Sequence, residues 1–276
     1  MWHEFKISLP DEQREPVTGV LFELGSQGIT EEDGCLTAYF PEDANPEEIS
    51  QALSGFDGVS VAYSPVGEQD WYSSWKENIT PFHAAGFLIC PPWRLEGCSP
   101  GEGEKLLVLD PGNAFGTGDH VTTMSVLEML REWTASVQGL SGKRFLDLGT
   151  GTGILSIAAY LYGIRDITAV DIEQPAIETA AGNFALNGLT DKVTLIKGSI
   201  GDAGSGFDLI AANIFQEALV ELMPDTVRAL NPGGSLIVSG LLAGQEGPVI
   251  SSAEKAGLKA VSVNTSKGWV SALFRA

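Results

Sequence analysis

The chain has 276 residues, of which 43% are hydrophobic and 19% are charged, so it is long enough for one large domain or for a small domain joined to a medium one. Its formal net charge of −20 disfavours direct binding to the phosphates of nucleic acids, and no apolar run approaches the ~18 residues that a membrane span needs. The first residues lack a basic region followed by an apolar stretch, so we expect a cytoplasmic protein without a secretory signal.

The acidic residues are distributed unevenly along the chain. The first 64 residues contain thirteen acidic residues against two basic ones. Two interpretations remain open at this point: the acidity serves solubility alone, or it attracts a basic protein partner.

The cysteines show no pattern that would point to a metal site. Cys35, Cys90 and Cys98 are odd in number and lack CxxC or Cys/His spacing. We therefore expect ordinary buried or partly buried thiols, and no metal.

The N-terminal segment predicts a small α+β domain. Its apolar residues alternate as in strands or recur at helical spacing, and Asn45 stands at an N-cap position before Pro46. Strands are expected at 5–9, 27–30, 35–40 and 58–64, and helices at 17–24 and 45–53. The order β-α-β-β-α-β is that of a ferredoxin-like domain, which would occupy residues 1–64.

Beyond this domain we expect a connecting segment and then an α/β domain. Residues 65–104 concentrate aromatic residues and prolines, as in a segment that packs against a neighbour. From 105 to 276, apolar runs typical of buried parallel strands appear, with helical segments between the first four of them. These runs lie at 144–149, 166–171, 193–198, 207–214 and 234–240. Two last candidate strands, at 258–264 and 269–274, predict an antiparallel hairpin at the sheet edge.

A glycine-rich loop follows the first of these strands. Gly149, Gly151 and Gly153 are spaced G-x-G-x-G, and Ile154 stands where the dinucleotide fingerprint G-x-G-x-x-G would have its last glycine. The loop therefore favours a ligand without a pyrophosphate. Asp171 ends the next strand, where its carboxylate can accept hydrogen bonds from both hydroxyls of a ribose, unless it only caps the following helix.

Several motifs resemble a known family. The stretches "LDLGTGTG", "VD" and "ANI" are similar to motifs of Rossmann-like S-adenosylmethionine-dependent methyltransferases. The stretch "LDPGNAFGTGDHVTT" from 109 to 123 resembles the signature of the PrmA family, which methylates ribosomal protein L11, and the resemblance extends over the whole chain. Asn113 and Phe215 replace the leucines that are usual at those two positions. The resemblance implies a Rossmann-like methyltransferase sheet, at residues 105–276, after the ferredoxin-like domain.

The resemblance also implies a cofactor site for S-adenosylmethionine. The loop after the first strand would hold its adenosine and methionine, and the loop of 114–120 would close over it. Phe115 would then offer an apolar face and Thr123 a hydroxyl. The implied cofactor-binding residues are Phe115, Thr123, Gly149, Gly151, Asp171 and Asn213.

Methyl transfer to an amine is an in-line displacement, so the protein mainly has to align a neutral nitrogen and exclude water. Asn213 ends the fourth strand, on the ligand side of the sheet, and its amide oxygen can accept a hydrogen bond from that nitrogen. We therefore assign Asn213 to catalysis as well, with a helix cap as the alternative. Trp269 is either an aromatic wall for the substrate or part of the packing, and His120 has no role that the sequence assigns.

The function implied by the resemblance is methylation of lysine side chains and of the N-terminal amine of ribosomal protein L11, with residues 1–64 recognising the substrate. Three alternatives remain open. The chain methylates another basic protein or a small amine, it is an NAD-dependent oxidoreductase, or it binds a ligand without catalysis.

Overall fold

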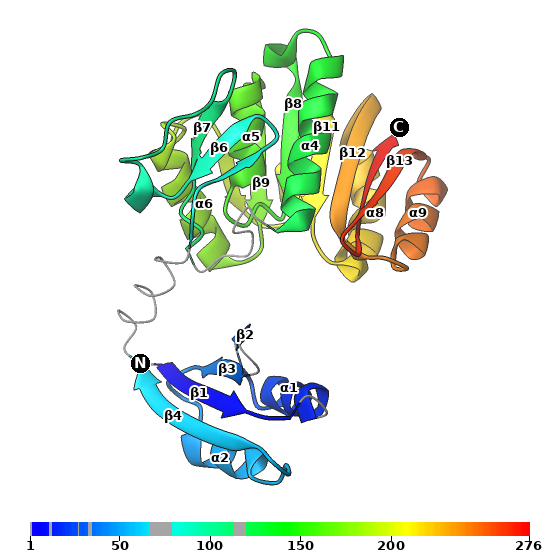
Figure 1. The fold of residues 1–276 in the computed structure, drawn as a ribbon. Coiled ribbons are helices and arrows are strands. Elements are labelled where there is room, and N and C mark those ends of the chain that lie inside the picture. The colour runs from blue at the N-terminus through cyan, green and yellow to red at the C-terminus, as the bar shows by residue number, and fades with distance from the viewer. Residues whose placement is uncertain (1, 11–12, 27, 33–34, 67–78, 113–119) are drawn as a thin grey trace. The chain divides into compact units, whose positions relative to one another are not determined.

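The structure is a computed structural model that describes the chain apart from residues 1, 11–12, 27, 33–34, 67–78 and 113–119. The chain forms two compact units, Met1–Ile79 and Thr80–Ala276 (Figure 1). None of the helices in the described parts of the chain is both long and apolar enough to cross a membrane.

The first unit has the element order expected from the sequence. Its elements are β1 (Trp2–Ser8), α1 (Arg14–Glu23), β2 (Gly28–Glu32), β3 (Cys35–Phe40), α2 (Pro46–Leu53) and β4 (Ser60–Val66). The strands form an antiparallel sheet in the order β2-β3-β1-β4. Alternate residues of β1 and β3, such as Phe5, Ile7 and Phe40, are fully buried with residues of both helices. The side chain of Asn45 caps α2 by accepting a hydrogen bond from the Glu47 N–H at 3.1 Å.

The second unit contains a seven-stranded sheet in the order β10-β9-β8-β11-β12-β14-β13. Its strands are β8 (Arg144–Leu148), β9 (Asp166–Asp171), β10 (Thr194–Lys197), β11 (Phe207–Asn213), β12 (Leu230–Leu242), β13 (Lys259–Ser266) and β14 (Trp269–Arg275). The strands from β10 to β12 pair in parallel, and β14 pairs antiparallel with both β12 and β13. The α/β class and the antiparallel edge hairpin predicted from the sequence are therefore confirmed.

Helices cover both faces of this sheet. They are α4 (Val121–Ser136), α5 (Ile154–Tyr162), α6 (Gln174–Leu186), α7 (Ile200–Ala203), α8 (Gln216–Ala229) and α9 (Glu246–Lys255). Side chains of α4, α5 and α6 share one core with residues such as Phe145 and Ala169, whereas α7, α8 and α9 share the other with residues such as Leu146 and Val170. Consecutive strand residues face opposite sides, so one strand feeds both cores.

Part of the expected connecting segment 65–104 belongs to the second unit. It contains β5 (Phe82–Ala84), β6 (Phe87–Cys90) and the short helix η2 (Pro92–Arg94). All four residues of β6 are buried, and β6 pairs in parallel with β7 (Lys105–Val108). The apolar run Phe87–Cys90 is a buried strand, but the prolines and aromatic residues around it obscured that pattern.

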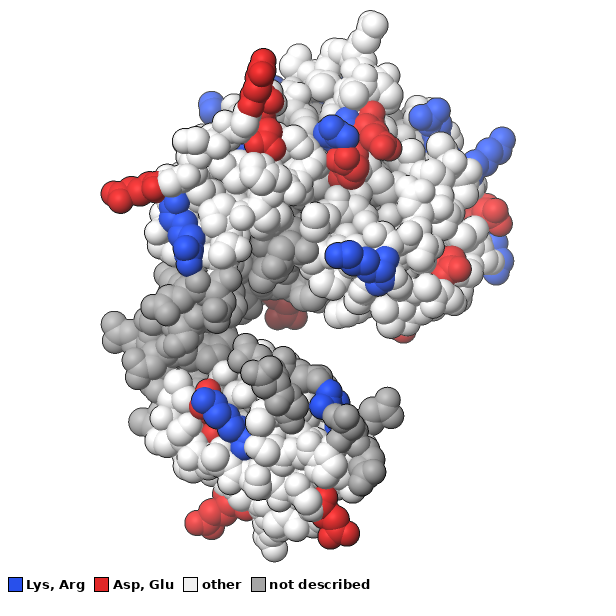
Figure 2. Space-filling view, in the orientation of Figure 1, with Lys and Arg blue, Asp and Glu red and all other residues white. Residues whose placement is uncertain are grey.

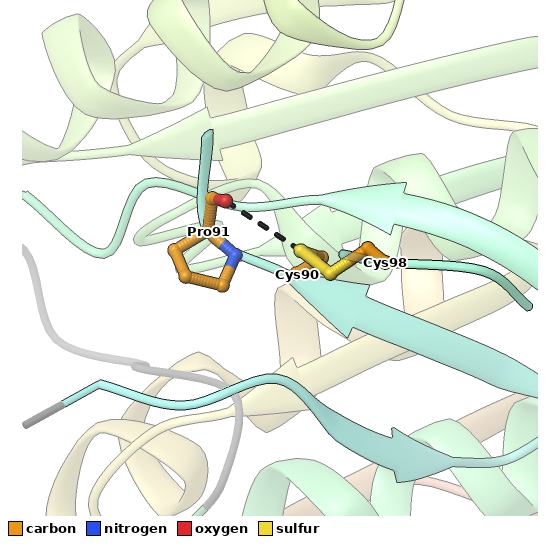
Figure 3. Close-up of a disulfide and its surroundings, with 3 residues drawn as sticks. All are labelled: Cys90, Pro91 and Cys98. Atoms are coloured by element: carbon orange, nitrogen blue, oxygen red, sulfur yellow. Dashed lines mark hydrogen bonds between the residues drawn. A yellow bond between two sulfur atoms is a disulfide. The ribbon is translucent and has the colours of Figure 1, made fainter. Parts of the chain in front are cut away.

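The expectation of three ordinary thiols is wrong for two of the cysteines. Cys90 and Cys98 form a disulfide, with their Cα atoms 6.7 Å apart (Figure 3). Cys90 ends β6, and the short turn of η2 brings the chain back to it after eight residues. This closure depends on the local fold and corresponds to no sequence motif. Cys35 is a free, half-buried thiol.

Candidate functional site

The second unit has a cavity of about 310 Å³ at the carboxyl ends of the parallel strands. Its walls come from the loop after β8, the ends of β9 and β11, the loop after β10 and the first turn of α4. Ligands of open α/β sheets bind at this edge, and small-molecule sites begin at about 300 Å³.

The glycine loop after β8 takes a shape that only glycine adopts without strain. Gly149, Gly151 and Gly153 have φ values of +73°, +53° and +82°. A Cβ atom at Gly153 would lie 2.7 Å from the ring of Phe184, so the backbone there lies close against α6. Gly149 and Gly151 line the cavity, whereas Gly153 packs against α6.

Asp171 connects this loop to the end of β9. One carboxylate oxygen accepts a hydrogen bond from the Gly151 N–H at 2.9 Å, and the other accepts one from the Glu173 N–H at 3.0 Å. An ionised carboxylate has about four acceptor positions, so two remain for hydroxyl groups in the cavity that Asp171 lines. The sequence analysis gave a helix cap as the alternative role of Asp171. The N-cap residue of α6 is Glu173 and not Asp171, although Asp171 accepts a hydrogen bond from the Glu173 N–H.

Replacing Asp171 by Ala should weaken cofactor binding about ten- to a hundredfold. The change removes a charge-assisted hydrogen bond, which contributes roughly 1.5–3 kcal/mol. Isothermal titration with S-adenosylmethionine measures the effect, and Glu178→Ala, an exposed acid on α6, serves as the control. Unchanged binding in Asp171→Ala would show that the carboxylate does not face the ligand.

Asp147, the acid of the glycine motif, is fully buried behind the loop. One of its oxygens accepts hydrogen bonds from the Thr150 hydroxyl at 2.8 Å, the Ser156 hydroxyl at 2.8 Å and the Ser156 N–H at 3.1 Å. Burial raises the pKa of Asp147 to about 6, although these hydrogen bonds oppose the shift. The carboxylate therefore ties the loop to the start of α5 and does not line the cavity.

The raised pKa of Asp147 predicts a pH dependence of stability. Protonation stabilises the native state below the unfolded-state pKa of 3.8, and this stabilisation is lost as the pH rises through about 6. In Asp147→Asn the side chain at position 147 does not titrate. Relative to that variant, the unfolding free energy of the unaltered protein should rise by about 1 kcal/mol when the pH is lowered from 7.5 to 5. Urea unfolding of both proteins measures it, and a constant difference between them would contradict the buried carboxylate.

Asn213 lies at the end of β11 and lines the same cavity. Its Nδ2 donates to the hydroxyl of Thr122 at 3.4 Å and to that of Thr123 at 3.3 Å. Its Oδ1 is buried and has no hydrogen-bond partner among the described residues. The helix-cap alternative is wrong, because the N-cap of α8 is Phe215 and no side chain caps it. Buried acceptors without a donor are rare in native proteins, and because this one lies on a residue that lines the cavity, it is a candidate to accept a hydrogen bond from a ligand.

The structure brings together most residues that the sequence singled out. Thr123, Gly149, Gly151, Asp171 and Asn213 all line the cavity. Trp269 lines it too, and its ring meets that of His120 edge-on with centroids 4.9 Å apart. Phe115 falls in 113–119, outside the described residues.

Sequence reasoning missed several residues that line the cavity, among them Thr122 and Gly240. Thr122 lies in α4, about 90 residues before Asn213, and its hydroxyl accepts a hydrogen bond from the Asn213 amide; no local sequence pattern predicts this contact. Gly240, with φ +90°, leaves no room for a Cβ atom, which would collide with the main chain of Ile214 next to Asn213. Its place at the end of the run 234–240 was the only available signal.

The chain matches known proteins over most of its length. The model of the family described as ribosomal protein L11 methyltransferase (PrmA) matches residues 29–276. A ribosomal protein L11 methyltransferase of Trichlorobacter lovleyi is 36% identical over 272 residues, which cover 89% of this chain and 88% of that protein. One from Brevibacillus brevis is 30% identical over 309 residues, covering 98% and 97%. The crystal structure of a ribosomal protein L11 methylase from Lactobacillus delbrueckii subsp. bulgaricus is 30% identical, with a TM-score of 0.60, and the match covers 68% of this chain and 94% of that one.

Proposed function

Because this chain belongs to the PrmA family of ribosomal protein L11 methyltransferases, we propose that it transfers methyl groups from S-adenosylmethionine to amino groups of ribosomal protein L11. We further propose that these amino groups are lysine side chains and the N-terminal amine. The observation that carries the proposal is the buried Oδ1 of Asn213, which has no partner among the described residues and belongs to a residue that lines the same cavity as a glycine loop and a carboxylate.

The cavity suits S-adenosylmethionine in its chemistry. Gly149 and Gly151 line the cavity without side chains of their own, and the free acceptor positions of Asp171 match two ribose hydroxyls. The exposed side chain of Ile172 follows Asp171 at the rim and offers an apolar surface. The bound cofactor supplies an electrophilic methyl group on a positively charged sulfur.

Asn213 would act on the incoming amine. A free lysine side chain has a pKa of ~10.4, so the nitrogen must lose a proton before it can attack. The Oδ1 atom then accepts a hydrogen bond from one N–H of the neutral amine, which directs the lone pair of the amine nitrogen into the cavity. Thr122 and Thr123 keep the Asn213 amide in place. Asn213 is thus a positioning acceptor and not a strong base.

The proposed substrate also gives the first unit a role and the reaction a cellular compartment. A ribosomal protein is basic, so the acidic first unit would attract it, and the reaction would take place in the cytoplasm, where ribosomal proteins are made.

The experiment is transfer of labelled methyl from S-adenosylmethionine into ribosomal proteins taken from cells that lack this gene. Label should enter ribosomal protein L11, and mass spectrometry should find it on lysine side chains and on the N-terminal amine. Label in another protein alone would point to a different substrate. A thermal-shift comparison of S-adenosylhomocysteine with NAD separates the oxidoreductase alternative, because only the former should raise Tm.

A further inference from the structure

A chain of contacts links Asn213 to a histidine that the proposed function does not use. His120 is the N-cap residue of α4, and its Nδ1 lies 2.8 Å from the Thr122 hydroxyl oxygen and 3.4 Å from the Thr122 backbone nitrogen. The Thr122 hydroxyl oxygen in turn lies 3.4 Å from Nδ2 of Asn213. The ring of Trp269, which meets the His120 ring edge-on, packs against the first member of this chain.

The backbone N–H of Thr122 fixes the direction of each hydrogen bond between His120, Thr122 and Asn213. The Thr122 N–H can only donate, so Nδ1 of His120 must be an acceptor and cannot carry a proton. The Thr122 O–H must therefore donate to Nδ1, and its oxygen faces Asn213 only as an acceptor. Asn213 must then present its donor Nδ2 to Thr122, which leaves Oδ1 as the group without a partner.

We propose that His120 is a positioning residue that sets the orientation of the Asn213 amide through the Thr122 hydroxyl. The inference rests on the proposed role of Asn213 and extends it. His120 touches neither the amine nor the cofactor in this scheme; it determines which end of the amide faces the amine. With the opposite orientation, Asn213 would present N–H groups to a nitrogen that needs an acceptor.

Loss of the His120 ring removes this control. The Thr122 O–H can then turn and donate to Oδ1 of a flipped amide, and this hydrogen bond replaces the one that Nδ2 donates in the productive orientation. With His120 present, the flipped amide would lose its hydrogen bond to Thr122, which disfavours it roughly five- to tenfold. Without the ring this preference disappears and the two orientations are about equally populated, while the cofactor site at Gly149 and Asp171 stays intact.

The test measures methyl transfer to ribosomal protein L11 by four variants. His120→Ala should lower kcat about twofold, because about half of the molecules then hold the amide in the unproductive orientation, and should leave the Kd for S-adenosylmethionine unchanged. His120→Asn should restore kcat to that of the unaltered protein, because Asn is a good N-cap whose oxygen can accept from both Thr122 donors. Thr122→Val should reproduce the loss of His120→Ala, whereas Thr122→Ser, which keeps the hydroxyl, should not.

A double-mutant cycle separates the relay from a structural effect. In an Asn213→Ala background, His120→Ala should lower kcat no further, because no amide remains to orient. An equal loss in both backgrounds, or His120→Asn as slow as His120→Ala, would overturn the inference. Melting curves show whether His120→Ala folds, and Thr122→Val carries the same test if it does not. If Asn213→Ala itself keeps full activity, the proposed role of Asn213 fails, and the inference fails with it.

Discussion

Replacing Asn213 by Ala should lower kcat for methyl transfer about a hundredfold while changing the Kd for S-adenosylmethionine less than about threefold. The reason is that Oδ1 acts where the amine is aligned, and alignment matters in the transition state more than in cofactor binding. Steady-state kinetics with ribosomal protein L11, together with calorimetry of cofactor binding, separates the two quantities.

Two controls make this result interpretable. Asn264→Ala changes an exposed asparagine on the edge strand β13 and should leave both kcat and Kd unchanged. Thr123→Val removes one of the two hydroxyls that hold Nδ2 and should cause a smaller loss, since Thr122 remains. If the losses in kcat and in melting temperature ran in parallel across these variants, Asn213 would be a structural residue.

The sequence was informative wherever the site depends on local order along the chain. Gly149 to Gly153 follow a strand, and Asp171 ends the next one, so the parallel arrangement alone brings them to one edge. Asn213 could be placed in the same way, because β11 pairs directly with β8. Its amide orientation could not be predicted, since it depends on two hydroxyls that approach from α4.

The features that the sequence did not predict depend on contacts between distant segments or on short patterns. The strand Phe87–Cys90 has four residues and becomes recognisable only through its pairing with β7. The disulfide between Cys90 and Cys98 requires the turn at η2. Gly240 is an ordinary strand end in the sequence, and its role comes from the main chain of Ile214, 26 residues earlier, against which it packs. Contacts of this kind leave no repeating pattern of residues in the sequence from which they could be predicted.

The first unit carries acidic side chains where a partner can reach them. Figure 2 shows acidic side chains projecting from the α2 side of this unit. Asp43, Glu47, Glu48 and Asp57 are all exposed, and two of them lie in the first turn of α2, where the helix dipole favours negative charge. None of these residues lines the cavity of the second unit. We propose that they act in capturing the substrate.

A chain shortened to residues 80–276 should therefore keep its affinity for S-adenosylmethionine but lose roughly a hundredfold in kcat/KM for intact ribosomal protein L11. The second unit has its own cores and contains every described residue that lines the cavity, which is why cofactor binding should survive. Calorimetry and methyl transfer at limiting substrate measure the two effects. A soluble shortened protein that methylated the intact substrate at the full rate would remove the recognition role and leave the acidity as an aid to solubility.

The charges themselves can be tested in the full chain, where no domain is lost. Neutralising Asp43, Glu47, Glu48 and Asp57 to the matching amides should lower kcat/KM for ribosomal protein L11 about tenfold at low salt, because attraction between opposite charges raises the association rate. The difference from the unaltered protein should shrink above ~0.15 M salt, where charges are screened beyond about 8 Å. The matched control neutralises four exposed acids of the second unit, Glu96, Glu102, Asp191 and Glu254, and so changes the net charge by the same amount. An equal loss in both quadruple variants would mean that net charge, and not the first unit, attracts the substrate.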